Sequence, residues 1–105
     1  MGAIRKLVMA TYAILLNFTD QGIRHVKDTT KRADAFKEMA TSSGVTVKNI
    51  YWTLGRYDLI ALIEASDDMT ATALGLSLGK AGNLRSETLR AFTHAEMSKI
   101  LGMVA

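Results

Sequence analysis

Two segments of the chain are apolar at almost every position, ATYAILLNF at residues 10–18 and LIALIEA at residues 59–65. Successive side chains of a β-strand point to opposite faces of the sheet, so a strand that is apolar in both sets is covered on both faces. We therefore expect both segments to be central strands of one sheet. With 105 residues, the chain has the length of a single domain.

Turn and helix signals divide the rest of the chain into further elements. Apolar or small residues at steps of three and four predict a helix from about residue 22 to residue 42, and the β-branched and aromatic content of residues 45–54 predicts a strand. A second helix is expected between Ser66-Asp67-Asp68 and Gly82-Asn83, followed by a strand at residues 84–92 and a short C-terminal helix.

Three capping signals mark where these helices begin and end. Asp20 can cap the start of the first helix, and Gly44 is suited to a left-handed position just after its end. Thr93 and Glu96 have the spacing of a capping box at the start of the last helix.

The resulting βαββαβ order predicts an α+β ferredoxin-like plait with a C-terminal helix. Right-handed crossovers place both long helices on one face of the sheet, which leaves the other face uncovered. Because a largely apolar sheet face is not left in water, we expect a dimer or larger homo-oligomer that packs sheet face against sheet face, as in a dimeric α/β barrel.

Composition and charge exclude several classes of function. The absence of Cys rules out thiolate catalysis, disulfides and Cys-based metal sites. Arg5 and Lys6 supply two of the three net positive charges, which leaves 11 basic against 10 acidic residues beyond Val8 and argues against a nucleic-acid partner. No apolar run reaches the ~18 residues that span a membrane. We expect a cytoplasmic domain at residues 9–105, with residues 1–8 as a mobile extension.

The second and third strands are joined by Gly55-Arg56-Tyr57-Asp58. A turn between antiparallel strands explains Gly55, which tolerates a positive φ. Tyr57 and Asp58 go beyond what a turn requires. An Asp at the entrance of a strand accepts backbone N–H groups, so we expect Asp58 to stiffen the hairpin.

The chain from Met9 onward resembles the GYD domain family, which is named for this Gly-x-Tyr-Asp signature. The matching segments are ATYAILLNFTDQGI, IYWTLGRYD and GNLRSETLRAF. The resemblance implies a ferredoxin-like fold and a dimeric or larger assembly, and it supplies no reaction. More distantly, the turn resembles the Gly-x-x-Asp turn in effector domains of leucine-responsive-type regulators, which bind amino acids between subunits.

Amphipathic aromatic and charged side chains in otherwise apolar strands are candidates to line a small-molecule pocket near the turn or between subunits. The candidate ligand-binding residues are Tyr12, Asn17, Trp52, Arg56, Tyr57, Asp58, Arg85 and Arg90. Their alternative interpretation is structural, with Trp52 in the core and the charged residues forming pairs at the sheet edge or interface. His25 and His94 have no partner in a metal-binding motif, so we expect neither a metal nor a cofactor.

Three functional hypotheses follow. The leading one is a homo-oligomeric small-molecule-binding or accessory domain whose ligand lies near Gly55 to Asp58 at a subunit interface. The second is a small cofactor-independent enzyme, monooxygenase- or isomerase-like, which would need His25, His94 or Asp58 as an acid or base in a cavity. The third is a purely structural subunit of a larger assembly. The sequence leaves open whether the protein is an enzyme.

Overall fold

The structure is a computed structural model that describes residues 9–105, so the expected extension at residues 1–8 lies outside the described part. The described chain contains four strands, four α-helices, of which the first is short, and one 3-10 helix. In order they are β1 (Ala10–Phe18), α1 (Asp20–Arg24), η1 (Val26–Asp28), α2 (Thr29–Ser42), β2 (Thr46–Trp52), β3 (Leu59–Ala65), α3 (Asp68–Lys80), β4 (Leu84–Ala91) and α4 (His94–Leu101).

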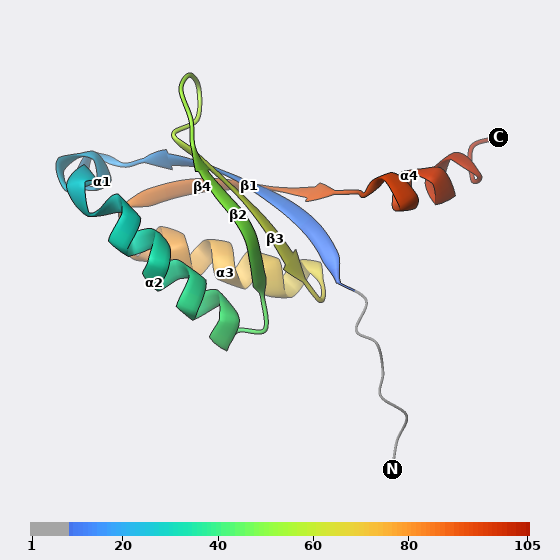
Figure 1. The fold of residues 1–105 in the computed structure, drawn as a ribbon, viewed down its shortest axis with the longest axis horizontal. Helices are drawn as coiled ribbons and strands as arrows, with labels where there is room; N and C mark the ends of the chain where they lie inside the picture. The colour runs from blue at the N-terminus through green and yellow to red at the C-terminus, as the bar shows by residue number, and fades with distance from the viewer. Residues whose placement is uncertain (1–8) are drawn as a thin grey trace, which may run out of the picture.

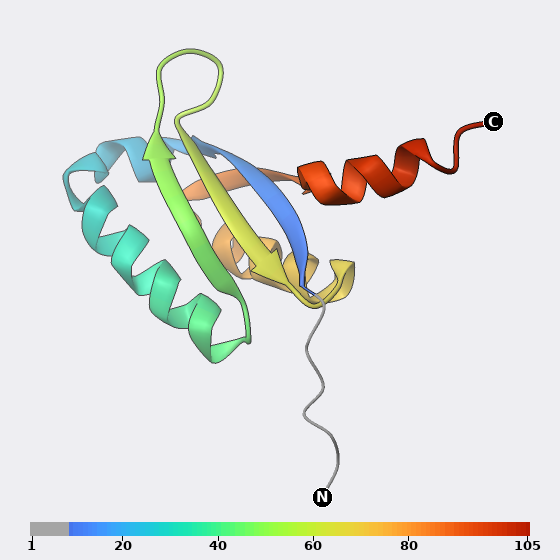
Figure 2. The same ribbon diagram turned by 45° about the vertical axis from the view of Figure 1, so that its right-hand side comes forward.

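The four strands form one sheet in the order β2-β3-β1-β4, and every neighbouring pair is antiparallel. The two apolar segments that were expected to be central strands are β1 and β3, and both occupy the centre of the sheet. Helices α2 and α3 lie on the same face of the strongly twisted sheet (Figures 1 and 2). The predicted ferredoxin-like plait is therefore confirmed, including the placement that right-handed crossovers impose.

The core lies between this sheet face and the two helices. Alternate residues of β1 and β3 are buried there, as the strand period requires. They pack against the buried faces of α2 and α3. Only a few residues of either helix are fully buried. The core residues are Tyr12, Ile14, Leu16, Phe36, Ala40, Val45, Leu59, Ala61, Ile63, Ala65, Ala71 and Leu74.

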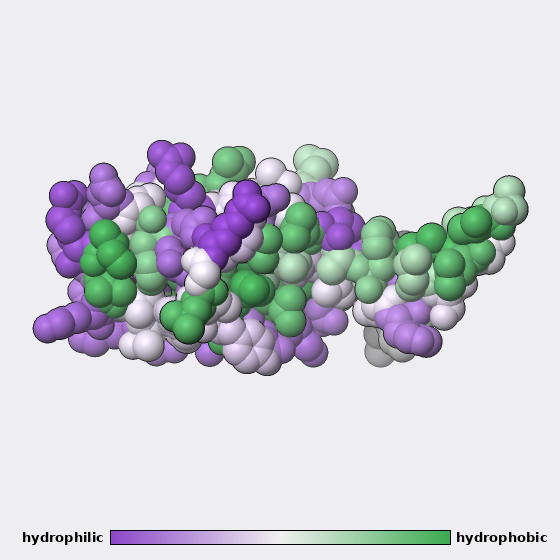
Figure 3. Space-filling view, turned by 90° about the horizontal axis from the view of Figure 1, so that it is seen from above, coloured by the Kyte–Doolittle hydropathy of each residue, from purple (hydrophilic) through white to green (hydrophobic). Residues whose placement is uncertain are grey.

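The opposite sheet face, here called the open face, carries the other set of side chains. None of the described helices covers it, since α2 and α3 share the other side (Figure 1). Cross-strand pairing places Ala13, Leu15, Ile60, Leu62 and Leu89 together at its centre. Seen from above, apolar side chains are spread across this side of the molecule and continue along α4 (Figure 3).

The first long helix is not continuous, which the apolar spacing did not predict. It is divided into α1, η1 and α2, and the break falls at His25, whose φ and ψ of −110° and 30° are not helical. The Arg32 guanidinium donates to the carbonyl oxygens of His25 and Gly22, at 2.9 and 3.4 Å, and so links α2 to the residues around the break. As a result Ile23, expected on the buried face, is 52% exposed.

Two of the three capping predictions are confirmed. Gly44 follows the end of α2 with a φ of +77°, and Thr93 and Glu96 form both hydrogen bonds of a capping box. The prediction for Asp20 is wrong, because Thr19 is the N-cap residue and its hydroxyl accepts from the Gly22 backbone N–H at 3.1 Å. Since β1 ends at Phe18, the residue in the capping position is Thr19.

The C-terminal helix α4 extends away from the sheet and the other helices (Figures 1 and 2). It exposes apolar side chains, among them Met97 at 46% and Leu101 at 58%, while Ile100 is half-buried. Among the described residues, no helix is long and apolar enough to cross a membrane.

Candidate functional site

The hairpin between β2 and β3 projects from the end of the sheet (Figure 2). Its base is closed by the Thr53 backbone N–H, which donates to the Asp58 carbonyl at 2.8 Å, and by the Thr53 hydroxyl, which donates to the Tyr57 carbonyl at 2.6 Å. Gly55 has a φ of +98°, in the region that side-chain-bearing residues avoid, as predicted.

Asp58 joins this hairpin to β1. Its carboxylate oxygen Oδ2 accepts a hydrogen bond from the Phe18 backbone N–H at 2.9 Å, and its own backbone N–H donates to the Leu16 carbonyl at 2.9 Å. The prediction that Asp58 accepts a backbone N–H is confirmed. The donor is on β1, so Asp58 ties the hairpin to the neighbouring strand.

Tyr57 reaches toward the open face beside the hairpin. Its hydroxyl donates to Glu87 Oε1 of β4 at 3.0 Å, and this hydrogen bond raises the pKa of Tyr57. Asn17 and Arg85 face each other across β1 and β4 at the same end of the sheet. Asn17, Tyr57, Arg85 and Glu87 therefore form a polar group, here called the hairpin-end group, beside the apolar centre of the open face. Glu87 was not in the predicted ligand set.

Arg56 and Trp52 lie outside this group. The Arg56 guanidinium carbon is 5.9 Å from the centre of the Tyr57 ring, and the side chain is exposed at the hairpin. Trp52 points to the helix-covered side, where its indole N–H donates to the Thr29 hydroxyl at 3.1 Å. The tryptophan is 44% exposed, so it is neither a fully buried core residue nor part of the open face.

Tyr12 and Arg90 are found near the other end of β1. Tyr12 is buried, and its hydroxyl donates to Asp68 Oδ1 at 2.6 Å. Burial, followed by the hydrogen bond to Asp68, raises the pKa of Tyr12 to about 12. The Arg90 guanidinium lies over the Tyr12 ring at 5.6 Å and forms an ion pair with Glu96 at 3.6 Å.

The eight candidate residues therefore do not line one pocket. Asn17, Tyr57 and Arg85 lie at the hairpin end of the sheet, whereas Tyr12 and Arg90 contact each other near the opposite end. The Asp58 carboxylate accepts a backbone N–H. His25 and His94 are both exposed. Within residues 9–105 there is no group of His, Asp and Glu side chains arranged to hold a metal ion.

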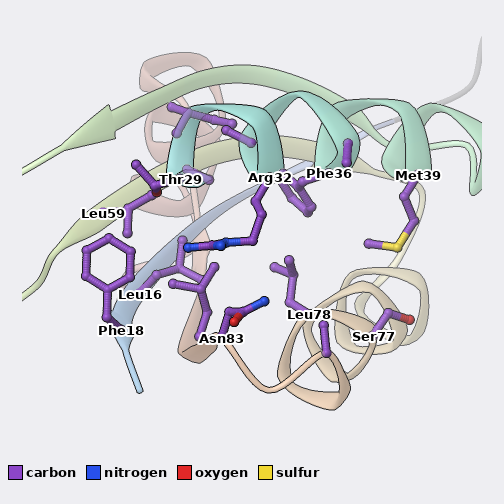
Figure 4. Close-up of a pocket in the computed structure, with 16 residues that line it drawn as sticks. Leu16, Phe18, Thr29, Arg32, Phe36, Met39, Leu59, Ser77, Leu78 and Asn83 are labelled. Atoms are coloured by element: carbon purple, nitrogen blue, oxygen red, sulfur yellow. The ribbon is translucent and has the colours of Figure 1, made fainter. Parts of the chain in front are cut away.

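A cavity that none of the eight candidates lines lies between α2, α3 and the sheet, with a volume of about 220 Å³. Figure 4 shows side chains from α2, α3 and β1 converging on it, with Arg32 reaching in from α2. Sequence reasoning missed this site because its walls come from several separated segments, on α2, α3 and the strands of the sheet among others, that are each typical of a core. Arg32 lies in the first turn of α2 among other charged residues, and nothing in the sequence distinguished it from them.

The chain is similar to known proteins in sequence. The chain is 31% identical over 90 residues to a protein of Thermus thermophilus named "Glutamine synthetase and cystathionine beta-lyase binding protein", a match that covers 85% of this chain and 95% of the relative. No solved structure matches the chain significantly. The family model described as "GYD domain" matches residues 12–101, which include the hairpin, the described helices and the sheet except for the first two residues of β1. The chain therefore belongs to the GYD domain family.

Proposed function

We propose that this protein is a binding or accessory protein that works as a homo-oligomer, with the open face as its subunit interface. The observation that carries the proposal is the open face itself. Its centre is apolar on β1, β3 and β4, and it lies opposite the helices that cover the other side of the sheet. A second sheet packed on it would remove this surface from water, which is the main driving force for association.

The composition of the open face fits an interface between copies. Leu15, Ile60 and Leu62 occupy the centre, and polar residues surround them, as in typical protein interfaces. The surrounding residues are Thr11, Asn17, Asn49, Glu64, Arg85 and Glu87. Helix α4 projects beyond the end of the sheet and exposes apolar residues (Figure 2), and we propose that they extend the same interface.

The family relationship supports a binding role. The Thermus thermophilus relative is named for binding two enzymes. The match covers 85% of this chain and 95% of the relative. We propose by extension that this chain also has a protein partner, which the assembled oligomer would bind.

A small molecule held between subunits beside the hairpin is the second candidate function. The hairpin-end group favours it, because Tyr57, Glu87, Asn17 and Arg85 present hydroxyl, carboxylate, amide and guanidinium groups beside an apolar surface. Native mass spectrometry of protein from its own host would distinguish this role, since a stoichiometric ligand would add a defined mass to the oligomer.

Sedimentation equilibrium of a matched pair of variants tests the interface. Leu62→Glu places a charge at the centre of the open face, and Leu76→Glu makes the same change on α3, where Leu76 is 70% exposed. We expect the wild type and Leu76→Glu to form oligomers and Leu62→Glu to be a folded monomer, because burying an unpaired carboxylate is strongly unfavourable. A wild-type monomer, or an oligomer that survives Leu62→Glu, would show that the open face is not the interface.

A further inference from the structure

The cavity between the helices and the sheet is apolar over most of its surface. Phe36 and Met39 of α2, Leu78 of α3, and Leu16 and Leu59 of the sheet form its walls (Figure 4). An engineered protein cavity of about 150 Å³ lined by such side chains holds benzene. A volume of about 220 Å³ therefore has room for one small ring or short aliphatic chain together with a polar head group.

One end of the cavity carries a positive charge. The Arg32 side chain extends from α2 into the cavity and turns toward Leu16 and Phe18 (Figure 4). Its Nη2 atom donates to the carbonyl oxygens of His25 and Gly22, which fixes the guanidinium in place. Among the residues that the structure describes, Nη1 and Nε of Arg32 have no acceptor, and no carboxylate is at ion-pair distance from it.

Asn83 adds an oriented amide at the same end. Its Oδ1 atom accepts from Gln21 Nε2 at 3.0 Å, which leaves the amide nitrogen Nδ2 as a donor. Figure 4 shows this nitrogen directed toward the space between Arg32 and Leu78. The two side chains thus offer several N–H donors at one end of the cavity, and such donors recognise a carboxylate.

We propose that this cavity binds a small apolar carboxylic acid, aromatic or short-chain aliphatic, in its ionised form. The carboxylate pairs with Arg32 and Asn83, and the apolar body lies among Phe36, Met39 and Leu78. A half-buried guanidinium without a counter-ion is the group that such a ligand satisfies, and the apolar walls add the burial of its ring or chain. The proposal does not depend on the open face, since the cavity lies on the helix-covered side of the sheet and within one subunit.

Titration with benzoate, followed by the amide chemical shifts of the full chain, tests the site. Benzyl alcohol is the uncharged probe of similar size. We expect benzoate to shift signals of residues around Phe36, Met39 and Leu78, and to bind at least about tenfold more tightly than benzyl alcohol, as one charge-assisted bidentate pair provides. Arg32→Met should abolish this preference, and Arg24→Met, at an exposed arginine of α1, should leave it unchanged.

Leu78→Phe is a second variant that keeps Arg32 and fills the apolar part of the cavity. It should weaken the binding of both probes. It also tests the site if Arg32→Met disturbs the turn whose carbonyl oxygens Arg32 binds. Equal affinity for the two probes in the wild type would show a cavity without anion recognition and overturn the proposal. Benzoate shifts that appear elsewhere, or that persist unchanged in Leu78→Phe, would also overturn it.

Discussion

Asp58 and Phe18, forty positions apart in the chain, are joined by a hydrogen bond of 2.9 Å from the Phe18 backbone N–H to the Asp58 carboxylate. This bond joins the last residue of β1 to the hairpin, beyond Leu16 and Leu59, which are the last paired residues of β1 and β3. It gives the Asp of the GRYD hairpin a structural role, and it fixes the hairpin from which Tyr57 reaches Glu87.

Removing this carboxylate is expected to destabilise the fold. Asp58→Ala leaves the Phe18 N–H without its acceptor at a half-buried position, so we expect the free energy of unfolding to fall by about 1–2 kcal/mol. Asp34→Ala, at an exposed position of α2, should change it by less than about 0.5 kcal/mol. Urea unfolding at one fixed protein concentration measures both variants, and equal stability of the two would refute the role assigned to Asp58.

Two glycine-to-alanine substitutions should act in opposite directions. Gly55→Ala puts a side chain at a φ of +98° and should cost about 1 kcal/mol. Gly79→Ala lies in α3, where an added Cβ meets no atom within 4 Å, and should gain about 0.5–1 kcal/mol through helix propensity. Thermal unfolding midpoints of the two variants, compared with the wild type, test this, and a stabilising Gly55→Ala would contradict the observed turn.

The Tyr12–Asp68 pair predicts a loss of stability in alkaline solution. The pKa of Tyr12 is raised from 10.0 to about 12, so the folded state keeps a proton that the unfolded state has already lost. Its contribution to stability is complete below pH 10 and is lost as the pH rises from 10 to 12. Urea unfolding across this range should show a steeper decline for the wild type than for Tyr12→Phe. Parallel declines would mean that Tyr12 is not held in its protonated form.

The capping box of α4 predicts local loosening of that helix in acid. The hydrogen bond from the Thr93 backbone N–H lowers the pKa of Glu96 below its ordinary value of 4.5. The cap is therefore complete above pH 4.5 and is lost as the pH falls through the lowered value. Hydrogen exchange of the α4 amides, corrected for intrinsic rates, should accelerate on acidification, while the amides of β1 should not follow.

Glu96→Gln and Thr93→Ala separate the two halves of that capping box. Glutamine retains the hydrogen bond without the charge, so the pH dependence of α4 exchange should disappear while its protection remains. Thr93→Ala removes the other bond and should cost α4 about 1 kcal/mol at every pH. If acid loosens α4 equally in Glu96→Gln, the titrating group is a different one.

The fold was predictable because its signals are local. The apolar runs of β1 and β3, the turn at Gly55 and the Thr93 capping box each act within a few residues. The break at His25 was not predictable in the same way. It depends on the Arg32 guanidinium folding back to carbonyls seven and ten residues earlier, and the spacing of apolar residues carries no information about that contact.

The candidate site was predictable only in part, for a related physical reason. Residue types singled out Asn17 and Arg85 in their strands, and the hairpin signature singled out Tyr57. Cross-strand register and the Tyr57–Glu87 hydrogen bond bring the three to one end of the open face. The same reasoning grouped them with Tyr12 and Arg90, which the register places near the opposite end of β1. The cavity at Arg32 depends on how far α2 and α3 stand apart, a distance that side-chain packing sets and that no local pattern records.

The claim that the open face is the subunit interface can be tested directly by isotope-filtered nuclear Overhauser spectroscopy on an equimolar mixture of labelled and unlabelled chains. This measurement detects only contacts between different copies. We predict contacts from the methyl groups of Leu15, Ile60 and Leu62 in one copy to open-face side chains in another. Contacts that instead involve Leu76 on α3, or the absence of any contact between copies, would contradict this claim.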